Sequence, residues 1–247
     1  MLQQLTPTVK KLLGINILVY LLTSIGLLSP EMLALHYFES KDFHFYQIIT
    51  YLFIHSSLMH LISNMFGLFM FGSLLERIWG KQRFTFFYFF CGVGAGLLYM
   101  GIQYYVDFSD LRRATRIVLD DPNAINLTDY WLKYGKISVP GGLINISLVQ
   151  QNYQEIVSSS ILGGASGAIF GIIMAFGYLF PNSEMYLFPF PIAIKAKWFV
   201  TLYGLYEMYS GIEKNTGDNV AHFAHIGGMI FAVILLKFWG TKRNNFY

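Results

Sequence analysis

Two polar side chains stand inside separate apolar runs of this 247-residue sequence, and their types are those of a nucleophile and its base. Ser166 follows a glycine pair in one run, and His225 lies in the last apolar run before the C-terminus. Polar groups inside a bilayer are costly, so each one needs a reason. A serine hydroxyl becomes an effective nucleophile when an adjacent imidazole takes its proton. The two residues therefore predict acyl-transfer chemistry, with Ser166 as nucleophile and His225 as base.

A second polar pair, His60 and Asn64, could stabilise the charge that develops in such a reaction. The two residues are four apart in the sequence, so they share one face of a helix. An imidazole and an amide can each donate a hydrogen bond to an oxyanion. If Gly163–Ala165 is irregular and a helix begins near Ser166, the free N–H groups of that helix add further donors.

Small residues surround Ser166 and His225 and predict close packing between their two helices. Gly164 and Gly167 flank the serine. Two stripes favour helix contact: Gly167, Gly171 and Ala175 in one run, and Ala224, Gly228 and Ala232 in the other. Packing alone could explain the glycines, but it does not explain why a serine and a histidine occupy the contact. Phe170, one turn after Ser166, is expected to stack on the imidazole.

No acidic side chain is expected to orient the imidazole of His225. Glu207 is the only carboxylate inside the apolar runs, and we predict it in an interfacial or loop contact near the outer end of its run. The expected arrangement is therefore a Ser166/His225 dyad in which packing orients the ring. His222 is expected to be a satisfied residue of the cavity wall.

The composition is that of a membrane protein. Hydrophobic residues make up 55% of the chain and charged residues 13%, against about 45–50% and about 25% in soluble domains. Aromatic residues reach 18%, and Trp and Tyr collect at bilayer interfaces. A net charge of +3 with dispersed Lys and Arg does not indicate a nucleic-acid partner. The single cysteine, Cys91, can form neither an intramolecular disulfide nor a structural zinc site.

Six apolar runs approach the length needed to cross a hydrocarbon core of about 30 Å. They cover about residues 11–29, 51–75, 84–105, 158–180, 197–212 and 219–239. The first run has no signal-peptide cleavage pattern and is expected to be retained. Residues 106–157 are expected to form a polar extramembrane insertion. The sequence thus predicts a single all-α membrane domain over 1–247, a six-transmembrane-helix bundle with a buried polar cavity.

The distribution of lysine and arginine predicts how this bundle is oriented. With six spans, the side that holds both termini carries ten of these residues, and the short loops of the other side carry two. The insertion adds five, but long loops count for less. We therefore expect both termini in the cytoplasm. Ser166 and His225 then share one depth, on the order of 10 Å below the opposite surface.

Three motifs on alternate runs resemble the rhomboid family of intramembrane serine proteases. They are His55–Asn64, Gly164–Gly167 and Ala224–Gly228, in the family's order. The resemblance implies a six-helix bundle whose water-filled cavity opens to the non-cytoplasmic side, in the cell membrane if the source is bacterial. It also implies a serine endopeptidase that cleaves membrane proteins in or near their transmembrane segments, with no cofactor and no metal.

The resemblance carries site roles over by motif position. Ser166 becomes the nucleophile, His225 the base, and His60 with Asn64 the donors on the oxyanion side. The supporting residues are Gly164, Gly167, Phe170, Gly228 and Glu76, and the last matches a position that ties the first loop region to the bundle. The family's first loop often carries a Trp-Arg pair where this chain has Tyr46-Gln47. That departure bears on contacts inside the loop and not on the chemistry.

Two other classes of function compete with a serine protease. A membrane metalloprotein could use His55, His60, His222 and His225. However, the sequence has no His-Glu-x-x-His motif, no carboxylate is expected among these histidines, and His55 and His60 would lie about 140° apart on a helix. A transporter usually shows an internal repeat, which this chain lacks. A non-catalytic protein that binds membrane helices would not need Ser166 and His225 together.

Overall fold

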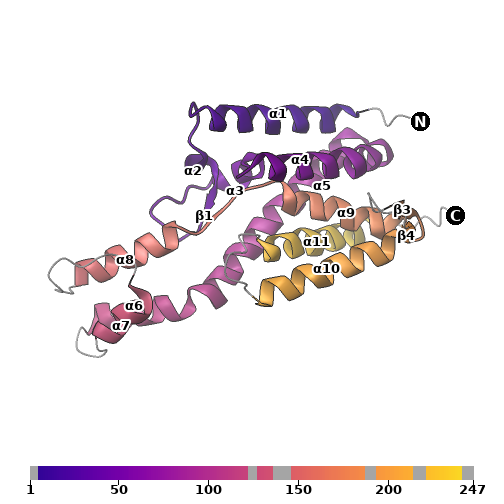
Figure 1. The fold of residues 1–247 in the computed structure, drawn as a ribbon. Helices are drawn as coiled ribbons and strands as arrows, with labels where there is room; N and C mark the ends of the chain where they lie inside the picture. The colour runs from indigo at the N-terminus through magenta and orange to yellow at the C-terminus, as the bar shows by residue number, and fades with distance from the viewer. Residues whose placement is uncertain (1–4, 122–126, 136–145, 187–192, 214–220, 241–247) are drawn as a thin grey trace.

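Helices dominate the computed structural model of this chain, which describes residues 5–121, 127–135, 146–186, 193–213 and 221–240 (Figure 1). Two short antiparallel sheets add to the helices. In one, β1 (Leu35–His36) pairs with β2 (Ile161–Leu162), and in the other, β3 (Glu184–Tyr186) pairs with β4 (Ala193–Lys195). The prediction of a helical fold is confirmed, and the sheets are a small departure from an all-α chain.

Every expected apolar run contains a helix. In chain order the helices are α1 (Pro7–Ser24), α2 (Pro30–Leu33), α3 (Gln47–Thr50), η1 (Tyr51–Phe53), α4 (Leu58–Gly67), η2 (Leu68–Gly72), α5 (Ser73–Ile102), η3 (Gln103–Asp107), α6 (Ser109–Asp120), α7 (Leu127–Tyr134), α8 (Ile146–Ser158), α9 (Ser166–Leu179), α10 (Ala196–Glu213) and α11 (His222–Phe238). Residues 219 and 220 of the sixth expected run lie outside the described residues.

Among the described residues, one continuous helical stretch is both long and apolar enough to cross a bilayer. It runs from Leu58 to Asp107, and its most apolar part has a mean hydropathy of 1.6. Gly80 breaks this stretch, since its φ of 77° and ψ of 165° are not helical. A left-handed φ favours glycine because it has no Cβ. The apolar helices α9 and α11 are shorter, at 14 and 17 residues.

Helices α5, α9 and α11 form the centre of the molecule, and small residues let α9 and α11 touch. A Cβ built on Gly228 would lie 1.8 Å from the carbonyl oxygen of Gly167. A Cβ on Gly171 would lie 3.1 Å from the carbonyl oxygen of Gly228 and 2.7 Å from the Cβ of Cys91. The predicted contact between the two small-residue stripes is therefore confirmed.

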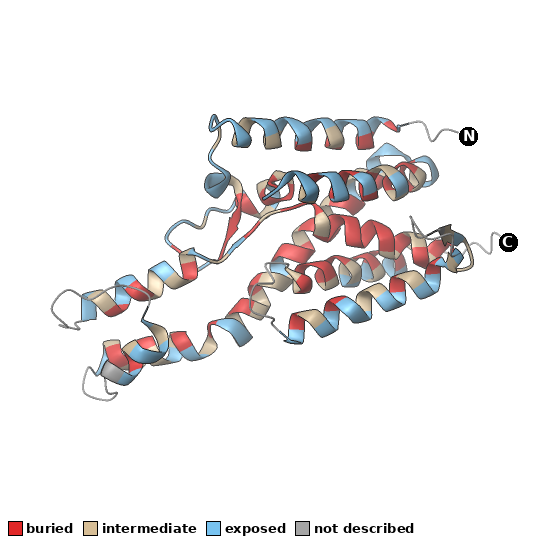
Figure 2. Cartoon of the chain, viewed as in Figure 1, coloured by how far each residue is buried: buried red, intermediate tan, exposed pale blue. Residues whose placement is uncertain are grey.

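The outer helices α1 and α10 present apolar side chains to the surroundings. Figure 2 shows α9 and α11 mostly buried, while much of α1 and α10 is exposed. The exposed side chains include Leu18, Leu21, Trp198, Leu202 and Ile212. Soluble monomers rarely expose apolar faces of this extent, and lipid tails are a suitable environment for them.

The first loop is held together by Gln47, which is fully buried. Its Oε1 accepts hydrogen bonds from the backbone N–H groups of His44 at 3.0 Å and His36 at 3.4 Å. Its Nε2 donates to the carbonyl oxygen of Asp42 at 3.0 Å. One amide side chain thus joins both arms of the loop, at the position where this sequence departs from the family's Trp-Arg pair.

Glu76 anchors the start of α1. Its carboxylate accepts hydrogen bonds from the Thr6 hydroxyl at 2.5 Å and from the backbone N–H groups of Thr8 and Val9 at 2.8 and 3.0 Å. The first N–H groups of a helix have no partner within it, so an acidic side chain stabilises them. The expectation that Glu76 ties the first loop to the bundle is therefore wrong: it ties α1 to α5.

The expected polar insertion, residues 106–157, contains helices with an apolar core of their own. Val118 of α6 and Val149 of α8 are fully buried in a cluster that also includes Tyr37 of the first loop. The Tyr37 hydroxyl accepts a hydrogen bond from Arg112 at 3.1 Å, and burial raises the pKa of this tyrosine to about 12. Residues 122–126 and 136–145 of the insertion lie outside the described part.

Candidate active site

Ser166 is the first residue of α9, and the segment just before it is not helical. β2 ends at Leu162, and Gly164 adopts a φ of 132° that L-residues with side chains rarely take. The expected run 158–180 is therefore not one continuous helix, because α8 ends at Ser158 and β2 and Gly164 lie between it and α9. The alternative expectation, an irregular segment with a helix that begins at Ser166, is confirmed.

His225 faces Ser166 directly. Its Nε2 lies 2.9 Å from the Ser166 Oγ. The ring of Phe170 stacks on the imidazole, with ring centroids 4.1 Å apart and an angle of 6° between the planes. Phe170 was expected on this face because it follows Ser166 by one turn of α9, and the stacking is confirmed. The close contact between Gly167 and Gly228, described above, holds the two helices at this separation.

Glu207 of α10 completes the arrangement, contrary to the expectation of an interfacial or loop contact. Its side chain is buried, and its Oε2 lies 2.8 Å from the Nδ1 of His225. An ionised carboxylate can only accept hydrogen bonds, so Nδ1 carries the proton. Nε2 then has its lone pair toward Ser166, whose hydroxyl donates to it. The expectation that no acidic residue orients this imidazole is wrong.

A signal for Glu207 was present in the sequence. A carboxylate inside an apolar run needs a partner, and histidines on the next run can supply one. Antiparallel helices bring residues together that lie at similar distances from their connection. In the expected runs 197–212 and 219–239, Glu207 lies five residues before the connection, and His222 and His225 lie three and six residues after it. Counting from the connection would have paired them.

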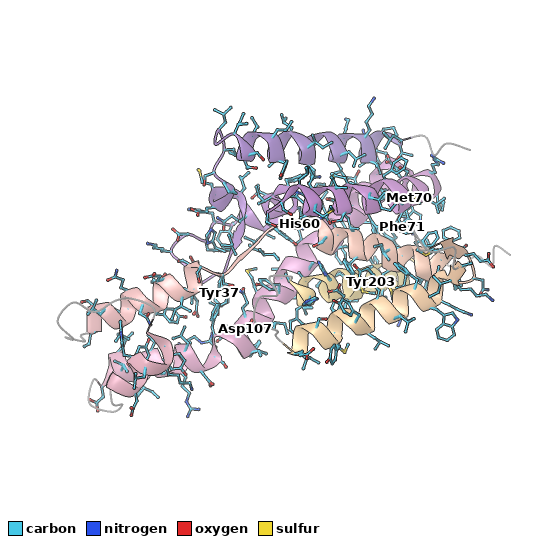
Figure 3. All side chains as sticks on the ribbon, in the orientation of Figure 1. Tyr37, His60, Met70, Phe71, Asp107 and Tyr203 are labelled. Atoms are coloured by element: carbon cyan, nitrogen blue, oxygen red, sulfur yellow. The ribbon has the colours of Figure 1, made fainter. Side chains whose placement is uncertain are left out.

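His60 and Asn64 lie on α4, beside the loop that precedes Ser166. A Cβ on Gly164 would lie 2.8 Å from the Nε2 of His60, so glycine leaves room for this imidazole. Figure 3 shows His60 close to the point where α9 begins. Asn64 is buried, and its Nδ2 donates to the carbonyl oxygen of His60 at 3.0 Å. The structure therefore brings His60 to the loop, whereas the amide of Asn64 bonds to its own helix.

The remaining two histidines differ in their surroundings. His222 contacts Glu207 through Nδ1 at 2.6 Å and is buried, in agreement with a satisfied residue of the cavity wall. His55 precedes α4, and its ring lies 5.0 Å from that of His60. The expected separation of about 140° around a helix is therefore wrong, because Ile54–Ser57 is not helical.

A cavity of about 2370 Å³ connects these groups. Ser166, His225, Glu207, His60 and Asn64 all line it, and apolar side chains from α4, α9 and α10 complete the wall. The serine, the imidazole and the α4 pair therefore share one space. A segment of another chain that enters this space could reach all of them.

The comparisons with known proteins agree with these motifs. A family model described as the rhomboid domain matches residues 42–111 and 124–241. Rhomboid protein 1, mitochondrial, from Saccharomyces cerevisiae is 29% identical over 110 residues, which cover 44% of this chain and 31% of that protein. RHOMBOID-like protein 12, mitochondrial, from Arabidopsis thaliana is 25% identical over 205 residues, which cover 82% of this chain and 48% of that protein.

The match therefore spans less than half the length of either relative, but the family model covers most of this chain. Its boundaries include the first loop from residue 42 onward, the insertion except residues 112–123, and every residue of the site described above. The chain belongs to the rhomboid family of integral membrane proteins, whose members are generally intramembrane serine proteases.

Proposed function

We propose that this chain is an intramembrane serine endopeptidase in which Ser166 is the nucleophile and His225 the base. The observation that carries the proposal is the 2.9 Å contact between the Ser166 Oγ and the His225 Nε2, with Glu207 on the opposite nitrogen of the ring. A nucleophile, a base and a group that orients the base form the arrangement that activates serine in unrelated hydrolases. Glu207 thus extends the predicted dyad to three residues.

The geometry supports a two-step acyl transfer. As the Ser166 Oγ attacks a peptide carbonyl carbon, its proton moves to the His225 Nε2. The resulting imidazolium carries its positive charge beside the Glu207 carboxylate. When the C–N bond breaks, the Nε2 proton goes to the leaving amine, and an ester to Ser166 remains. A water molecule then gives a proton to Nε2 as its oxygen attacks the ester carbon. The bond between that carbon and the Ser166 Oγ breaks, Nε2 returns the proton to Oγ, and the second product leaves as a carboxylic acid.

Donors for the oxyanion come from two elements. The first N–H groups of α9 have no partner within the helix and carry its positive dipole end, so they favour negative charge beside Ser166. His60 lies across the Gly164 backbone from the serine and supplies an imidazole donor. Asn64 can join them if its amide turns away from the carbonyl oxygen of His60. Each such donor is worth on the order of 10²–10³ in kcat in other serine hydrolases.

The proposed bundle has six spans. They are α1, the two halves of the stretch Leu58–Asp107 on either side of Gly80, α9, α10 and α11. In this arrangement the active site lies toward the ends of α9 and α11 that are far from the two termini (Figure 1). The cytoplasmic location of both termini stays a prediction.

The substrates are proteins with transmembrane segments, preferably ones whose helices are weakened by Gly or Pro, because a stable helix hides its peptide bonds.

The competing functions have less support. A transporter or a non-catalytic protein that binds membrane helices gives no reason for a hydroxyl, an imidazole and a carboxylate in one hydrogen-bonded row. A metal-dependent hydrolase would use His222, His225 and Glu207 as ligands, but the same His225 is aligned on Ser166. Serine chemistry uses every one of these contacts except that of His222.

Cleavage of a single-span model substrate by the full chain in detergent or liposomes tests the proposal. Ser166→Ala and His225→Ala should each abolish cleavage. Ser73→Ala is the matched control, because Ser73 is a fully buried serine on α5 away from the cavity. Its removal should leave cleavage intact. Cleavage by Ser166→Ala at the rate of the unmodified chain would contradict the proposal.

A further inference from the structure

Beside the serine, three side chains present metal-ligating atoms to one point. The Oε2 of Glu207 lies 2.6 Å from the Nδ1 of His222 and 2.8 Å from the Nδ1 of His225. The ligand atoms of the three residues all lie within 4.8 Å of one another. All three side chains are buried, with relative exposures of 2%, 7% and 8% for Glu207, His222 and His225.

This donor set is one that zinc accepts. Two imidazole nitrogens and one carboxylate oxygen bind Zn²⁺ in several hydrolases, with bonds of about 2.0–2.1 Å and an open fourth position. Tetrahedral ligands at that bond length lie about 3.4 Å apart. The observed separations of 2.6 and 2.8 Å need to widen by less than about 1 Å. A cation would then take the place of the two Nδ1 protons that Glu207 now accepts.

The site can be reached, because all three residues line the same cavity as Ser166. It also depends on two separate helices, since Glu207 comes from α10 and both histidines from α11. Bound metal would therefore join these helices at the end of the bundle where the site opens. His225 would be the residue shared between the metal site and the catalytic site.

We infer that His222, Glu207 and His225 form an inhibitory site for a divalent transition-metal ion of the zinc type. A cation on the Nδ1 of His225 opposes the positive charge that this ring gains when it takes the Ser166 proton. It also neutralises the carboxylate that would stabilise that charge. Binding of the metal does not depend on the proposed function, whereas inhibition rests on it.

Binding is tested in the full-length Ser166→Ala chain, which separates metal affinity from catalysis. Co²⁺ is the probe, because a tetrahedral complex with nitrogen and oxygen ligands absorbs in the visible range. We expect saturation at one Co²⁺ per chain and displacement by Zn²⁺. His222→Asn keeps a donor toward Glu207 but removes the ligand, and should lower the affinity by at least roughly ten- to a hundredfold, the loss typical of a group that only orients a ligand. His44→Asn, on an exposed loop histidine, should not change it.

Inhibition is tested with the cleavage assay on chains that retain Ser166. Zn²⁺ should inhibit the unmodified chain, a chelator should restore cleavage, and His222→Asn should need roughly ten- to a hundredfold more Zn²⁺ for the same inhibition. Because each variant is compared with itself with and without Zn²⁺, a change in basal rate does not affect the comparison. If His222→Asn does not fold, His222→Gln replaces it.

The outcomes separate the two proposals. Saturable Co²⁺ binding without cleavage by any chain would support the metal site and contradict the protease function. Cleavage without saturable Co²⁺ binding would contradict the metal site alone. Equal Co²⁺ affinity in His222→Asn and His44→Asn would also overturn the inference, because the metal would then be bound elsewhere.

Discussion

In the proposed mechanism, the carboxylate of Glu207 determines which nitrogen of His225 can take a proton from Ser166. It accepts a hydrogen bond from Nδ1 and so leaves Nε2 free to act as the base. In the proposed reaction it also carries the negative charge that faces the imidazolium. The ring is thus oriented by a charged group as well as by the stacked ring of Phe170.

Replacement of Glu207 by glutamine is expected to lower kcat by roughly 10²-fold or more, because an amide has no charge and can favour the wrong tautomer. KM should change little, since Glu207 acts through His225. Glu213→Gln, at the exposed end of the same helix, is the control. Steady-state cleavage kinetics provide the measurement, and a kcat within twofold of that of the unmodified chain would exclude a role for Glu207.

The two α4 residues are expected to contribute unequally. His60→Ala should lower kcat by on the order of 10²–10³, the effect of one oxyanion donor. Asn64→Ala should have a smaller effect, because its Nδ2 already donates to the carbonyl oxygen of His60. Cleavage rates of both variants at saturating substrate check this order. A larger loss in Asn64→Ala would show that the amide turns into the site.

At the scale of single residues, the sequence predicted the contacts that follow from spacing along one helix. Ser166 and Phe170 share a face of α9 because they are one turn apart, and His225 lies next to its small-residue stripe. For Glu207, counting from the connection gives the level along the helix but not the direction of the side chain. Its contact depends on the rotation of α10 about its own axis, which is set by packing against α11 and not by the residues around Glu207.

Among the elements, the crossing of α9 and α11 sets the distance between Ser166 and His225. The backbones touch at Gly167 and Gly228, and any side chain at the latter would meet the carbonyl oxygen of Gly167. The stripes were readable from the sequence because small residues recur every four positions. The irregular segment before Ser166 was expected from its glycines, whereas the pairing of β1 with β2 was not, because it joins residues far apart in the sequence.

Gly228→Ala is expected to destabilise the chain by about 1–3 kcal/mol or more, because the added methyl group overpacks the crossing. It should also slow cleavage, since Ser166 and His225 are forced apart. Gly14→Ala is the control: that glycine lies on α1 with open space around it, so alanine should be neutral or stabilising. Thermal unfolding in detergent measures both. Equal melting temperatures for the two variants would contradict the proposed close contact.

At the scale of the whole molecule, the described residues form two apolar cores. The larger one lies among α1, α4, α5, α9, α10 and α11, and the smaller one joins α6, α7 and α8 to Tyr37 of the first loop. Part of the smaller core was readable, because Leu111, Thr115 and Val118 recur on one face of α6 and are buried. The contact of this core with the first loop could not be predicted, because Arg112 and Tyr37 lie about 75 positions apart and share no local sequence pattern.

Val118→Ala should destabilise the smaller core by about 1–3 kcal/mol, because it leaves a cavity among fully buried neighbours. The larger core should be unaffected, since the two clusters share no residue. Hydrogen exchange followed by mass spectrometry should show faster exchange in α6 and α8 and no change in α9 and α11. Val106→Ala is the control, because Val106 is exposed. Faster exchange in α9 would show that the cores unfold together.

The central claim is that Ser166 is a nucleophile activated by His225, and a covalent probe tests it most directly. A fluorophosphonate should react with the full chain in detergent and leave one phosphonyl group on the peptide that contains Ser166, as identified by mass spectrometry. His225→Ala should remove the label, and Ser73→Ala should retain it. No reaction with the unmodified chain, or equal labelling of the His225→Ala chain, would contradict the claim.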